Sequence, residues 1–368
     1  MNPPNKKIIL SGGGSGGPVA PLLAVAAELK KMDSEVEFLF VGTNSGPEKQ
    51  MAEQAGIKFV AIPAAKFRRY FSFANVTDIF VLIKGLFAAN KIIKNFKPAI
   101  VFGAGGYVAV PVSWMAKFHN VKVAVHQQDA KVGLANRLIS PFSDIVTTAF
   151  ERTAKEFVSG LPFFSSTVKP GAEWTGNPVR AEFFTPANKD THEKFGIKDE
   201  FPVMLVVGGA TGATQINQVV VEALPELVKS HQVIHITGPG KNTAVFKHAH
   251  YHAFEFLSEE YPEALKIADM VITRAGLSSI AELSVLGKIA IVVPIPNSHQ
   301  EYNAKILKER AAAVVLNSQE FTATDLPRIV TSVKFNPARQ KTLKLNISNI
   351  MPHDAATRIA NILLKYVR

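Results

Sequence analysis

Short apolar segments alternate with segments of helical periodicity along most of the chain. KKIILS, EVEFLFVG and KPAIVFG, all rich in Val, Ile and Phe, each precede a stretch in which apolar residues recur at helical spacing. Such alternation is typical of a parallel sheet covered by helices on both faces. The pattern predicts an α/β fold, with helices at residues 19–30, 48–55, 108–118 and about 354–366.

The alternation stops in a stretch rich in Pro, Gly and Ser, residues 159–186, which we interpret as an interdomain linker. It restarts with FPVMLVVGGATGATQINQ, so the second half opens as the first does, with a strand, a glycine loop and a helix. We therefore expect two Rossmann-like domains that face a cleft, at residues 1–174 and 175–351, and a C-terminal helix, 352–368, that returns to the first domain.

Composition and charge narrow the class of protein. The 368 residues suffice for two domains, and the chain contains no cysteine, which excludes disulfides and cysteine nucleophiles and fits a reducing compartment. No secretory signal is visible at the start, so we expect a cytoplasmic protein. The net charge of +11 calls for a polyanionic partner. Because no nucleic-acid-binding module is recognisable, anionic membranes and phosphorylated ligands remain as the candidate partners.

The first glycine loop matches G-x-G-x-x-G at Gly12, Gly14 and Gly17. A dinucleotide site also needs an acidic residue after the second strand, which here ends FLFVGTNSG, and no Gly-Lys-Ser/Thr follows to make a P-loop. A glycine loop that leads into a helix can still hold a diphosphate through backbone N–H groups. The alternative is that the glycines serve only tight packing. Two such loops, at 12–17 and 208–212, favour two diphosphate sites.

The segment RAGLSSIAEL carries the clearest ligand signal. Gly276 and Ser278 indicate a helix start, and Glu282 follows one turn later, where a carboxylate can accept two hydrogen bonds from a ribose diol. A solvated helix residue is the alternative interpretation of Glu282. Polar side chains that suit sugar hydroxyls follow the next strand at His299, Gln300 and Asn303.

Together these segments resemble the MurG-type N-acetylglucosaminyltransferases of bacterial peptidoglycan synthesis, which have the GT-B fold. The resemblance covers nearly the whole length, and its motifs come in the family's order: GGGSGG at 12–17, GAGGYVAVP at 103–111, HQQDAKVGLANRL at 126–138, TGNPVR at 175–180, GGATGATQIN at 208–217, RAGLSSIAE at 274–282 and HQEYNA at 299–304. It implies inverting transfer of N-acetylglucosamine from UDP-N-acetylglucosamine to undecaprenyl-diphospho-N-acetylmuramoyl-peptide, without an obligatory metal or cofactor.

The resemblance also implies site residues. For the donor these are Arg180 at the diphosphate, Gly208, Gly209 and Gly212 at the phosphates, Phe256 and Leu257 at the uracil, Glu282 at the ribose, and His299 and Gln300 at the sugar, with Gly276, Ser278 and Asn303 beside them. For the acceptor they are Gly13, Gly14, Ser15, Gly16 and Gly17, with Tyr107, Gln127 and Gln128.

The chain departs from the family pattern at the position of a much discussed base. Pro18 stands where a histidine is usual, Asp129 where asparagine is usual and Gln127 where glutamate is usual. Ala210 and Thr211 replace a serine and a polar residue in the second loop. Proline suits a first helical position but moves no proton. We therefore predict Asp129 as the proton acceptor, with His126 as the second candidate; an ordinary turn residue is the alternative for Asp129.

Two segments, FRRYFSF and residues 78–97, combine aromatic, aliphatic and basic side chains as membrane-surface elements do. The residues predicted to contact an anionic membrane are Phe67, Arg68, Arg69, Phe80, Lys84 and Phe87. A core helix with a basic outer face is the alternative. The longest apolar run, residues 79–89, contains Lys84 and is shorter than the roughly 20 residues that span a bilayer. We expect a peripheral protein at the cytoplasmic face of the cell membrane, with no nucleic-acid partner.

Two other functions stay open. The first is a different GT-B lipid glycosyltransferase, such as one acting on diacylglycerol, although TGNPVR and HQEYNA argue against it. The second is a non-catalytic protein that binds a UDP-sugar or a lipid diphosphate and has lost its base, which Pro18 would permit.

Overall fold

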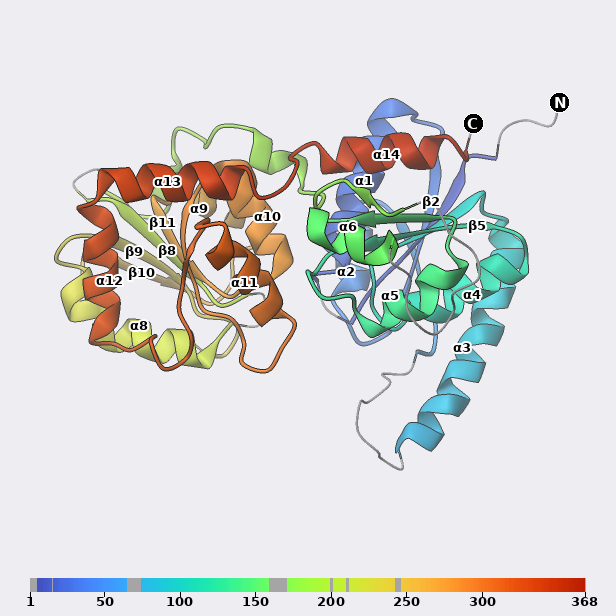
Figure 1. The fold of residues 1–368 in the computed structure, drawn as a ribbon, viewed down its shortest axis with the longest axis horizontal. Coiled ribbons are helices and arrows are strands. Elements are labelled where there is room, and N and C mark those ends of the chain that lie inside the picture. The colour runs from blue at the N-terminus through green and yellow to red at the C-terminus, as the bar shows by residue number, and fades with distance from the viewer. Residues whose placement is uncertain are drawn as a thin grey trace. The chain divides into compact units, whose positions relative to one another are not determined.

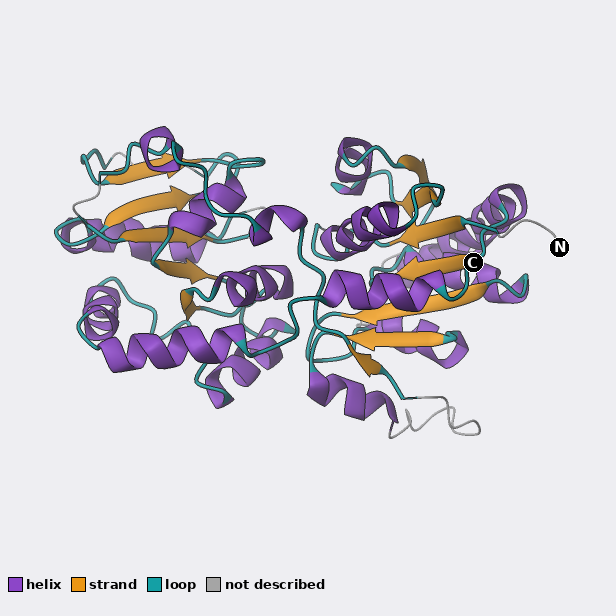
Figure 2. Ribbon diagram, turned by 90° about the horizontal axis from the view of Figure 1, so that it is seen from above, coloured by secondary structure: helices purple, strands orange, loops and turns teal. Residues whose placement is uncertain are grey.

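The chain folds into two compact units, each built on one parallel sheet with helices on both faces (Figures 1 and 2). The computed structural model describes residues 5–14, 16–64, 74–158, 171–198, 201–209, 212–241 and 246–367. The first unit comprises Met1–Arg180 with Met351–Arg368, and the second comprises Ala181–Ile350. The predicted α/β architecture of two parallel-sheet domains is confirmed.

Within its described residues the first unit has a seven-stranded sheet in the order β3-β2-β1-β4-β5-β6-β7, and all neighbouring strands are parallel. The strands are β1 (Lys7–Ser11), β2 (Glu37–Gly42), β3 (Lys58–Ala61), β4 (Ile100–Gly103), β5 (Lys122–Gln127), β6 (Ile145–Thr148) and β7 (Glu173–Trp174). The helices are α1 (Val19–Met32), α2 (Glu48–Gln54), α3 (Ala74–Phe96), α4 (Ala109–Phe118), α5 (Leu134–Ile139), α6 (Glu151–Val158), α14 (Ala355–Leu364) and the short 3₁₀ turn η1 (Ser140–Phe142).

Strand β1 divides the core of this unit between the two faces of the sheet. Ile8 and Leu10 pack with α1 and α14 on one face, whereas Ile9 packs with α3 and α4 on the other. This is the two-residue alternation of side chains expected of a strand that is buried on both faces.

The C-terminal helix α14 lies against α1 (Figure 1). Ile359 and Leu363 share a buried cluster with Leu22 of α1, and the Thr357 hydroxyl donates a 3.0 Å hydrogen bond to Glu28 Oε1. The first unit extends to Arg180, beyond the predicted boundary at residue 174. Buried apolar surface thus ties the end of the chain to the first unit.

Within its described residues the second unit has a six-stranded sheet in the order β10-β9-β8-β11-β12-β13, again parallel throughout. The strands are β8 (Val203–Val207), β9 (Gln232–Ile236), β10 (Tyr251–Phe254), β11 (Met270–Thr273), β12 (Ile289–Val292) and β13 (Val314–Val315). The helices are α7 (Thr191–Lys194), α8 (Thr214–Leu227), α9 (Tyr261–Ile267), α10 (Leu277–Leu286), α11 (Gln300–Glu309), α12 (Asp325–Lys334), α13 (Pro337–Ser348) and the 3₁₀ turn η2 (Ala181–Phe184).

Each sheet has one point at which the chain reverses the direction of strand order. In the first unit this point lies between β1 and β4, and in the second it lies between β8 and β11. Loops that leave neighbouring strands in opposite directions open a crevice there, and open α/β sheets bind ligands at the carboxyl ends of the strands beside it. The two predicted glycine loops follow β1 and β8, so both lie at these points.

Candidate functional site

The first glycine loop connects β1 to α1, and Pro18 enters the helix with helical backbone angles, φ −69° and ψ −18°. The N–H groups of Val19 and Ala20 both donate to the Gly16 carbonyl, at 3.1 Å each. Anion binding at this loop therefore depends on N–H groups that precede Val19. Ser15 of this loop lies outside the described residues.

Two glycine-rich loops meet at the switch point of the first unit. Gly106 has φ +85°, and a Cβ there would lie 2.6 Å from the Gly13 carbonyl oxygen. A Cβ on Gly14 would lie 2.9 Å from the Tyr107 ring. The structure thus brings Tyr107 and the loop at 12–17 together, as the predicted acceptor site requires.

A buried carboxylate that sequence reasoning missed lies beneath this loop. Glu48, the first residue of α2, is fully buried, and its Oε1 accepts hydrogen bonds from the Thr43 N–H at 2.9 Å, the Thr43 hydroxyl and the Gly14 N–H at 3.3 Å. A Cβ on Gly13 would overlap the same carboxylate. Glu48 therefore shapes the loop from inside. Its only sequence signal is an acidic residue at a helix start.

His126 was predicted as the second candidate base, and the structure corrects this. It lies inside β5, is fully buried, and has Thr147 Oγ1 2.9 Å from Nδ1 and Asn177 Oδ1 3.3 Å from Nε2. Burial lowers the pKa of His126 to about 4, so the ring is neutral at physiological pH. With both nitrogens occupied inside the sheet, it cannot reach a substrate hydroxyl.

Gln127 and Gln128, predicted beside the acceptor, are also buried and serve the fold. The Gln127 amide donates to the carbonyls of Asp129 at 2.7 Å and Lys131 at 3.2 Å, and its Oε1 accepts from Asn136 at 2.7 Å. Gln128 donates to the Ala104 carbonyl at 2.9 Å, which ties the loop after β5 to the loop after β4. Their described hydrogen bonds lie within the protein, and a contact with the acceptor stays a prediction.

Asp129 is the second residue after β5, in the loop that Gln127 and Gln128 hold by hydrogen bonds. Its side chain is half-buried, in contrast to the buried residues before it. Because β5 neighbours β4, Asp129 lies at the same sheet edge as the glycine loops. It remains the candidate proton acceptor.

The second glycine loop connects β8 to α8. Gly212 has φ +69°, and a Cβ there would overlap the Thr237 carbonyl oxygen, which also accepts a 2.8 Å hydrogen bond from Asn217. Lys241, which sequence reasoning missed, donates from Nζ to the Gly212 carbonyl at 3.2 Å. A cation therefore lies on the loop predicted to hold phosphates. Ala210 and Thr211 of this loop lie outside the described residues. Gly208 and Gly209 precede them.

Helix α10 begins as predicted, with Gly276 at its N-cap in extended conformation. Ser278 Oγ is buried and has no hydrogen-bond partner among the described residues. Glu282 is half-buried and accepts a 3.0 Å hydrogen bond at Oε2 from the hydroxyl of Tyr261 on α9. The predicted ribose contact is therefore held by a side chain from another helix.

Helix α11 supplies the amide cluster, but its members differ in accessibility. His299 is exposed at the N-cap, and Gln300 has its Nε2 4.0 Å from the position of a Cβ on Gly276 while its Oε1 accepts from the Ile295 N–H at 3.2 Å. Asn303 is fully buried and donates to the Ala275 carbonyl at 3.0 Å. Asn303 therefore fixes the loop before α10, and its predicted role as a sugar contact is wrong.

Arg274 directly follows β11 and is a second cation at the carboxyl ends of the strands of the second sheet. The sequence analysis gave it no role. Its guanidinium donates to the carbonyls of Val293 at 3.1 Å and Pro294 at 3.4 Å, and burial lowers its pKa.

The other predicted donor residues differ in exposure. Phe256, predicted at the uracil, is 56% exposed after β10, and Leu257 beside it is half-buried. Arg180 is half-buried at the end of the first unit.

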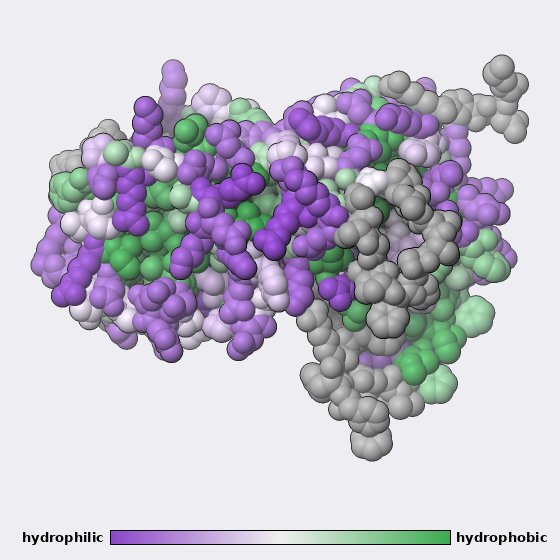
Figure 3. Space-filling model, viewed as in Figure 1, coloured by the Kyte–Doolittle hydropathy of each residue, from purple (hydrophilic) through white to green (hydrophobic). Residues whose placement is uncertain are grey.

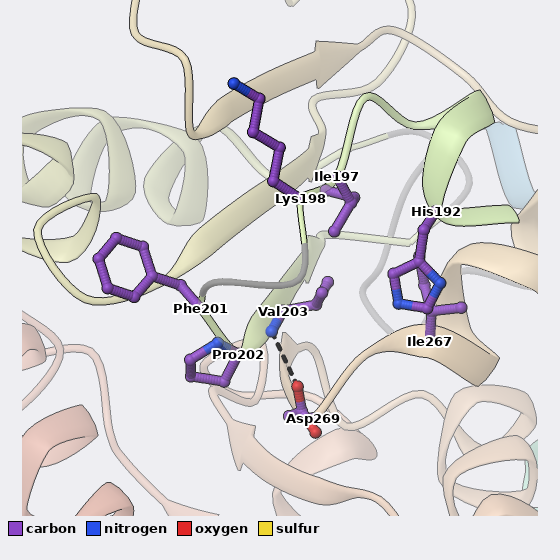
Figure 4. Close-up of a pocket in the computed structure, with 8 residues that line it drawn as sticks. All are labelled: His192, Ile197, Lys198, Phe201, Pro202, Val203, Ile267 and Asp269. Atoms are coloured by element: carbon purple, nitrogen blue, oxygen red, sulfur yellow. Dashed lines mark hydrogen bonds between the residues drawn. The ribbon is translucent and has the colours of Figure 1, made fainter.

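A cavity of about 390 Å³ opens at the amino ends of strands β8 and β11 of the second sheet (Figure 4). Val203 and Asp269 line it where β8 and β11 begin, and Asp269 Oδ2 accepts a 2.8 Å hydrogen bond from the Val203 N–H. His192 points into the same space from α7. This cavity lies at the amino ends of the strands, so it is separate from the predicted donor residues.

Helix α3 presents an apolar face outward, visible as a green patch over that helix in Figure 3. Phe80 is 64% and Phe87 72% exposed, and Ile79 and Ile83 on the same helix are exposed as well. Lys84 is exposed on the same helix. The exposed side chains of α3 are therefore apolar as well as basic. No helix among the described residues is long and apolar enough to cross a membrane.

Three residues of the predicted membrane surface, Phe67, Arg68 and Arg69, lie outside the described residues.

Comparisons with known proteins identify the family and the fold. The sequence models of the glycosyltransferase family 28 N-terminal and C-terminal domains match residues 8–148 and 203–358. A Clostridium tetani protein named UDP-N-acetylglucosamine--N-acetylmuramyl-(pentapeptide) pyrophosphoryl-undecaprenol N-acetylglucosamine transferase is 37% identical over 86% of this chain and 87% of its own. A Clostridium kluyveri protein of the same name is 35% identical over 98% of this chain and 99% of its own. The crystal structure of Acinetobacter baumannii MurG, 24% identical, covers 98% of this chain and 100% of its own with a TM-score of 0.73, which shows the GT-B fold.

Proposed function

The chain belongs to glycosyltransferase family 28, and we propose that it transfers N-acetylglucosamine from UDP-N-acetylglucosamine to N-acetylmuramyl-pentapeptide linked through pyrophosphate to undecaprenol. This is the reaction for which its relatives are named. The observation that carries the proposal is that each unit has a glycine loop at its switch point, one for each diphosphate substrate.

We propose that the second unit binds the donor. Glu282 would accept hydrogen bonds from the ribose diol, and Gln300 would present its amide nitrogen to the sugar beside Gly276. The start of the second glycine loop, at Gly208 and Gly209, and the Lys241 ammonium would stabilise the diphosphate, and this stabilisation grows as negative charge develops on the leaving UDP. Arg180 is a further candidate for the diphosphate.

We propose that the first unit binds the lipid diphosphate at the loop of Gly13, Gly14, Gly16 and Gly17, beside Tyr107. The acceptor hydroxyl would attack C1 of the donor sugar and give its proton to the Asp129 carboxylate, while the bond from C1 to UDP breaks. Asp129 suits this role because it is the half-buried carboxylate in the loop after β5, at the edge where the acceptor loops meet.

We propose that the protein binds the cytoplasmic face of the membrane peripherally through α3. The exposed faces of Phe80 and Phe87 would insert at the level of the lipid headgroups, and Lys84 would meet anionic lipid. This location supports the proposed reaction because a lipid-linked acceptor presents its sugar at the membrane surface.

A transfer assay tests the function. The purified protein would be mixed with radiolabelled UDP-N-acetylglucosamine and the undecaprenyl-linked muramyl-pentapeptide in detergent, and the labelled lipid would be extracted and identified by mass spectrometry. We expect one N-acetylhexosamine added to the acceptor and UDP released in equal amount. Label on diacylglycerol instead would identify a different lipid glycosyltransferase. Donor binding without transfer to any lipid would favour the non-catalytic alternative.

A further inference from the structure

The Glu282 carboxylate is held by a tyrosine that no motif singled out. Tyr261, the first residue of α9, donates its phenolic hydrogen to Glu282 Oε2 at 3.0 Å across to α10. We propose that Tyr261 is a positioning residue, which orients this carboxylate for the ribose diol of the donor nucleotide. The proposal rests on the proposed function, because it requires Glu282 to lie in the donor site.

The Tyr261 ring is itself fixed by packing. Phe183, in the 3₁₀ turn η2, is 1% exposed and meets the Tyr261 ring edge to face, with centroids 6.2 Å apart and an interplanar angle of 73°. Such a pair favours one ring orientation over others. The hydroxyl is therefore presented to α10 from a rigid support.

Helix α9 is anchored at its other end by a nearly buried ion pair. The Lys266 side chain is 5% exposed and lies 2.7 Å from Glu263 Oε1. Glu263 Oε2 accepts from the Asn188 N–H at 2.7 Å and the Thr191 hydroxyl at 2.9 Å. These contacts fasten the short helix to the segment that follows η2, so Tyr261 has little freedom to drift from Glu282.

A positioned carboxylate binds a diol better than a mobile one. Glutamate has several rotatable bonds, and ordering such a side chain on binding opposes association. The hydrogen bond from Tyr261 holds Oε2 in one position, and a carboxylate can accept several hydrogen bonds, including those of hydroxyl groups. Tyr261 thereby lowers the cost of ordering Glu282 without touching the nucleotide.

The test is the substitution Tyr261→Phe, which removes the hydroxyl and keeps the ring packed on Phe183. Calorimetry would measure the Kd of the intact protein for UDP and for 2′,3′-dideoxy-UDP. We expect Tyr261→Phe to weaken UDP binding roughly three- to tenfold, the range for one immobilised side chain. Binding of the dideoxy analogue should not change, because it offers no diol. In the transfer assay the donor KM should rise by the same factor while kcat stays constant.

A matched control removes a tyrosine hydroxyl elsewhere in the same unit. Tyr251 lies at the start of β10, and its hydroxyl is 3.0 Å from His235 Nδ1. Tyr251→Phe should lower thermal stability but leave the Kd for UDP as in the parent. It therefore separates loss of a buried hydrogen bond from loss of carboxylate orientation.

Three outcomes decide the proposal. Selective loss of UDP affinity in Tyr261→Phe supports it. Equal weakening for both nucleotides, or none, overturns it, provided that Glu282→Ala weakens UDP binding. If Glu282→Ala binds UDP as the parent does, the proposed donor site itself is wrong, and the role of Tyr261 falls with it.

Discussion

Replacing the two exposed phenylalanines of α3 should release the protein from membranes. In the double variant Phe80→Ser/Phe87→Ser the helix should persist, because serine and phenylalanine have similar helix propensities and neither side chain is buried in the core. The perturbation therefore acts on the surface of α3 and leaves the fold in place.

The magnitude follows from exposure. Removing a phenylalanine side chain fully from water contributes about 2 kcal/mol, so the 64% of Phe80 and 72% of Phe87 that are exposed contribute about 1.3 and about 1.4 kcal/mol on insertion. The sum of about 2.7 kcal/mol corresponds to about a hundredfold in the partition coefficient.

Cosedimentation with vesicles that contain phosphatidylglycerol would measure this partition coefficient. The matched control is Phe335→Ser, because Phe335 is 75% exposed at the end of α12 in the second unit. We expect the control to bind vesicles like the parent. High salt should weaken the contribution of Lys84 and spare that of the phenylalanines. If the double variant binds as tightly as the parent, α3 is not the membrane-binding surface.

Three further predictions concern the chemistry and the pH dependence. Asp129→Asn should lower turnover roughly 10²- to 10⁴-fold and leave the Kd for UDP-N-acetylglucosamine unchanged; full turnover in this variant would exclude Asp129 as the proton acceptor. Lys241→Met should weaken UDP binding about tenfold by loss of a charge-assisted contact, with uridine binding unaffected as measured by calorimetry. Burial lowers the pKa of His126, His231 and His235 from 6.5 to about 4, so below pH 6.5 the unfolded chain takes up protons that the folded chain refuses. The free energy of unfolding should therefore fall with falling pH down to about pH 4, by about 1.4 kcal/mol per pH unit for each histidine. Urea titrations at several pH values would measure this dependence, and in His235→Gln its slope should be smaller by the contribution of one histidine.

The strands and their alternation with helices could be predicted because both faces of each sheet are covered, which makes the central strands continuously apolar. Helix α4 begins at Ala109, one residue after the predicted start, and helix α10 begins directly after the predicted cap Gly276. The edge strands β10 and β13 were not predicted. Both are short: β13 has two residues, and in β10 the polar His252 interrupts the apolar residues.

The site was harder to predict, because polar residues at a strand end have two possible uses. His126 was predicted as a second candidate base and Gln127 and Gln128 as neighbours of the acceptor, but β5 continues through Gln127, and the described hydrogen bonds of these side chains go to partners inside the protein. The partners of His126 are Thr147 and Asn177, which come from distant parts of the chain, so no local sequence pattern predicts these contacts. Tyr261 escaped prediction for the same reason, since only the packing of α9 beside α10 brings it to Glu282.

The glycines of both loops have a packing role, and the ligand binding proposed for the loops is compatible with it. A side chain at Gly13 would overlap the Glu48 carboxylate, one at Gly106 the Gly13 backbone, and one at Gly212 the Thr237 carbonyl. Close packing inside the protein therefore requires glycine at each of these positions. Both loops lie at the carboxyl ends of β1 and β8, where we propose that backbone N–H groups meet a diphosphate. Pro18 completes the first loop by starting α1 without an N–H or a titratable group. Pro18 therefore gives this loop no group that could take a proton, and the proposed proton acceptor is Asp129, in the loop after β5.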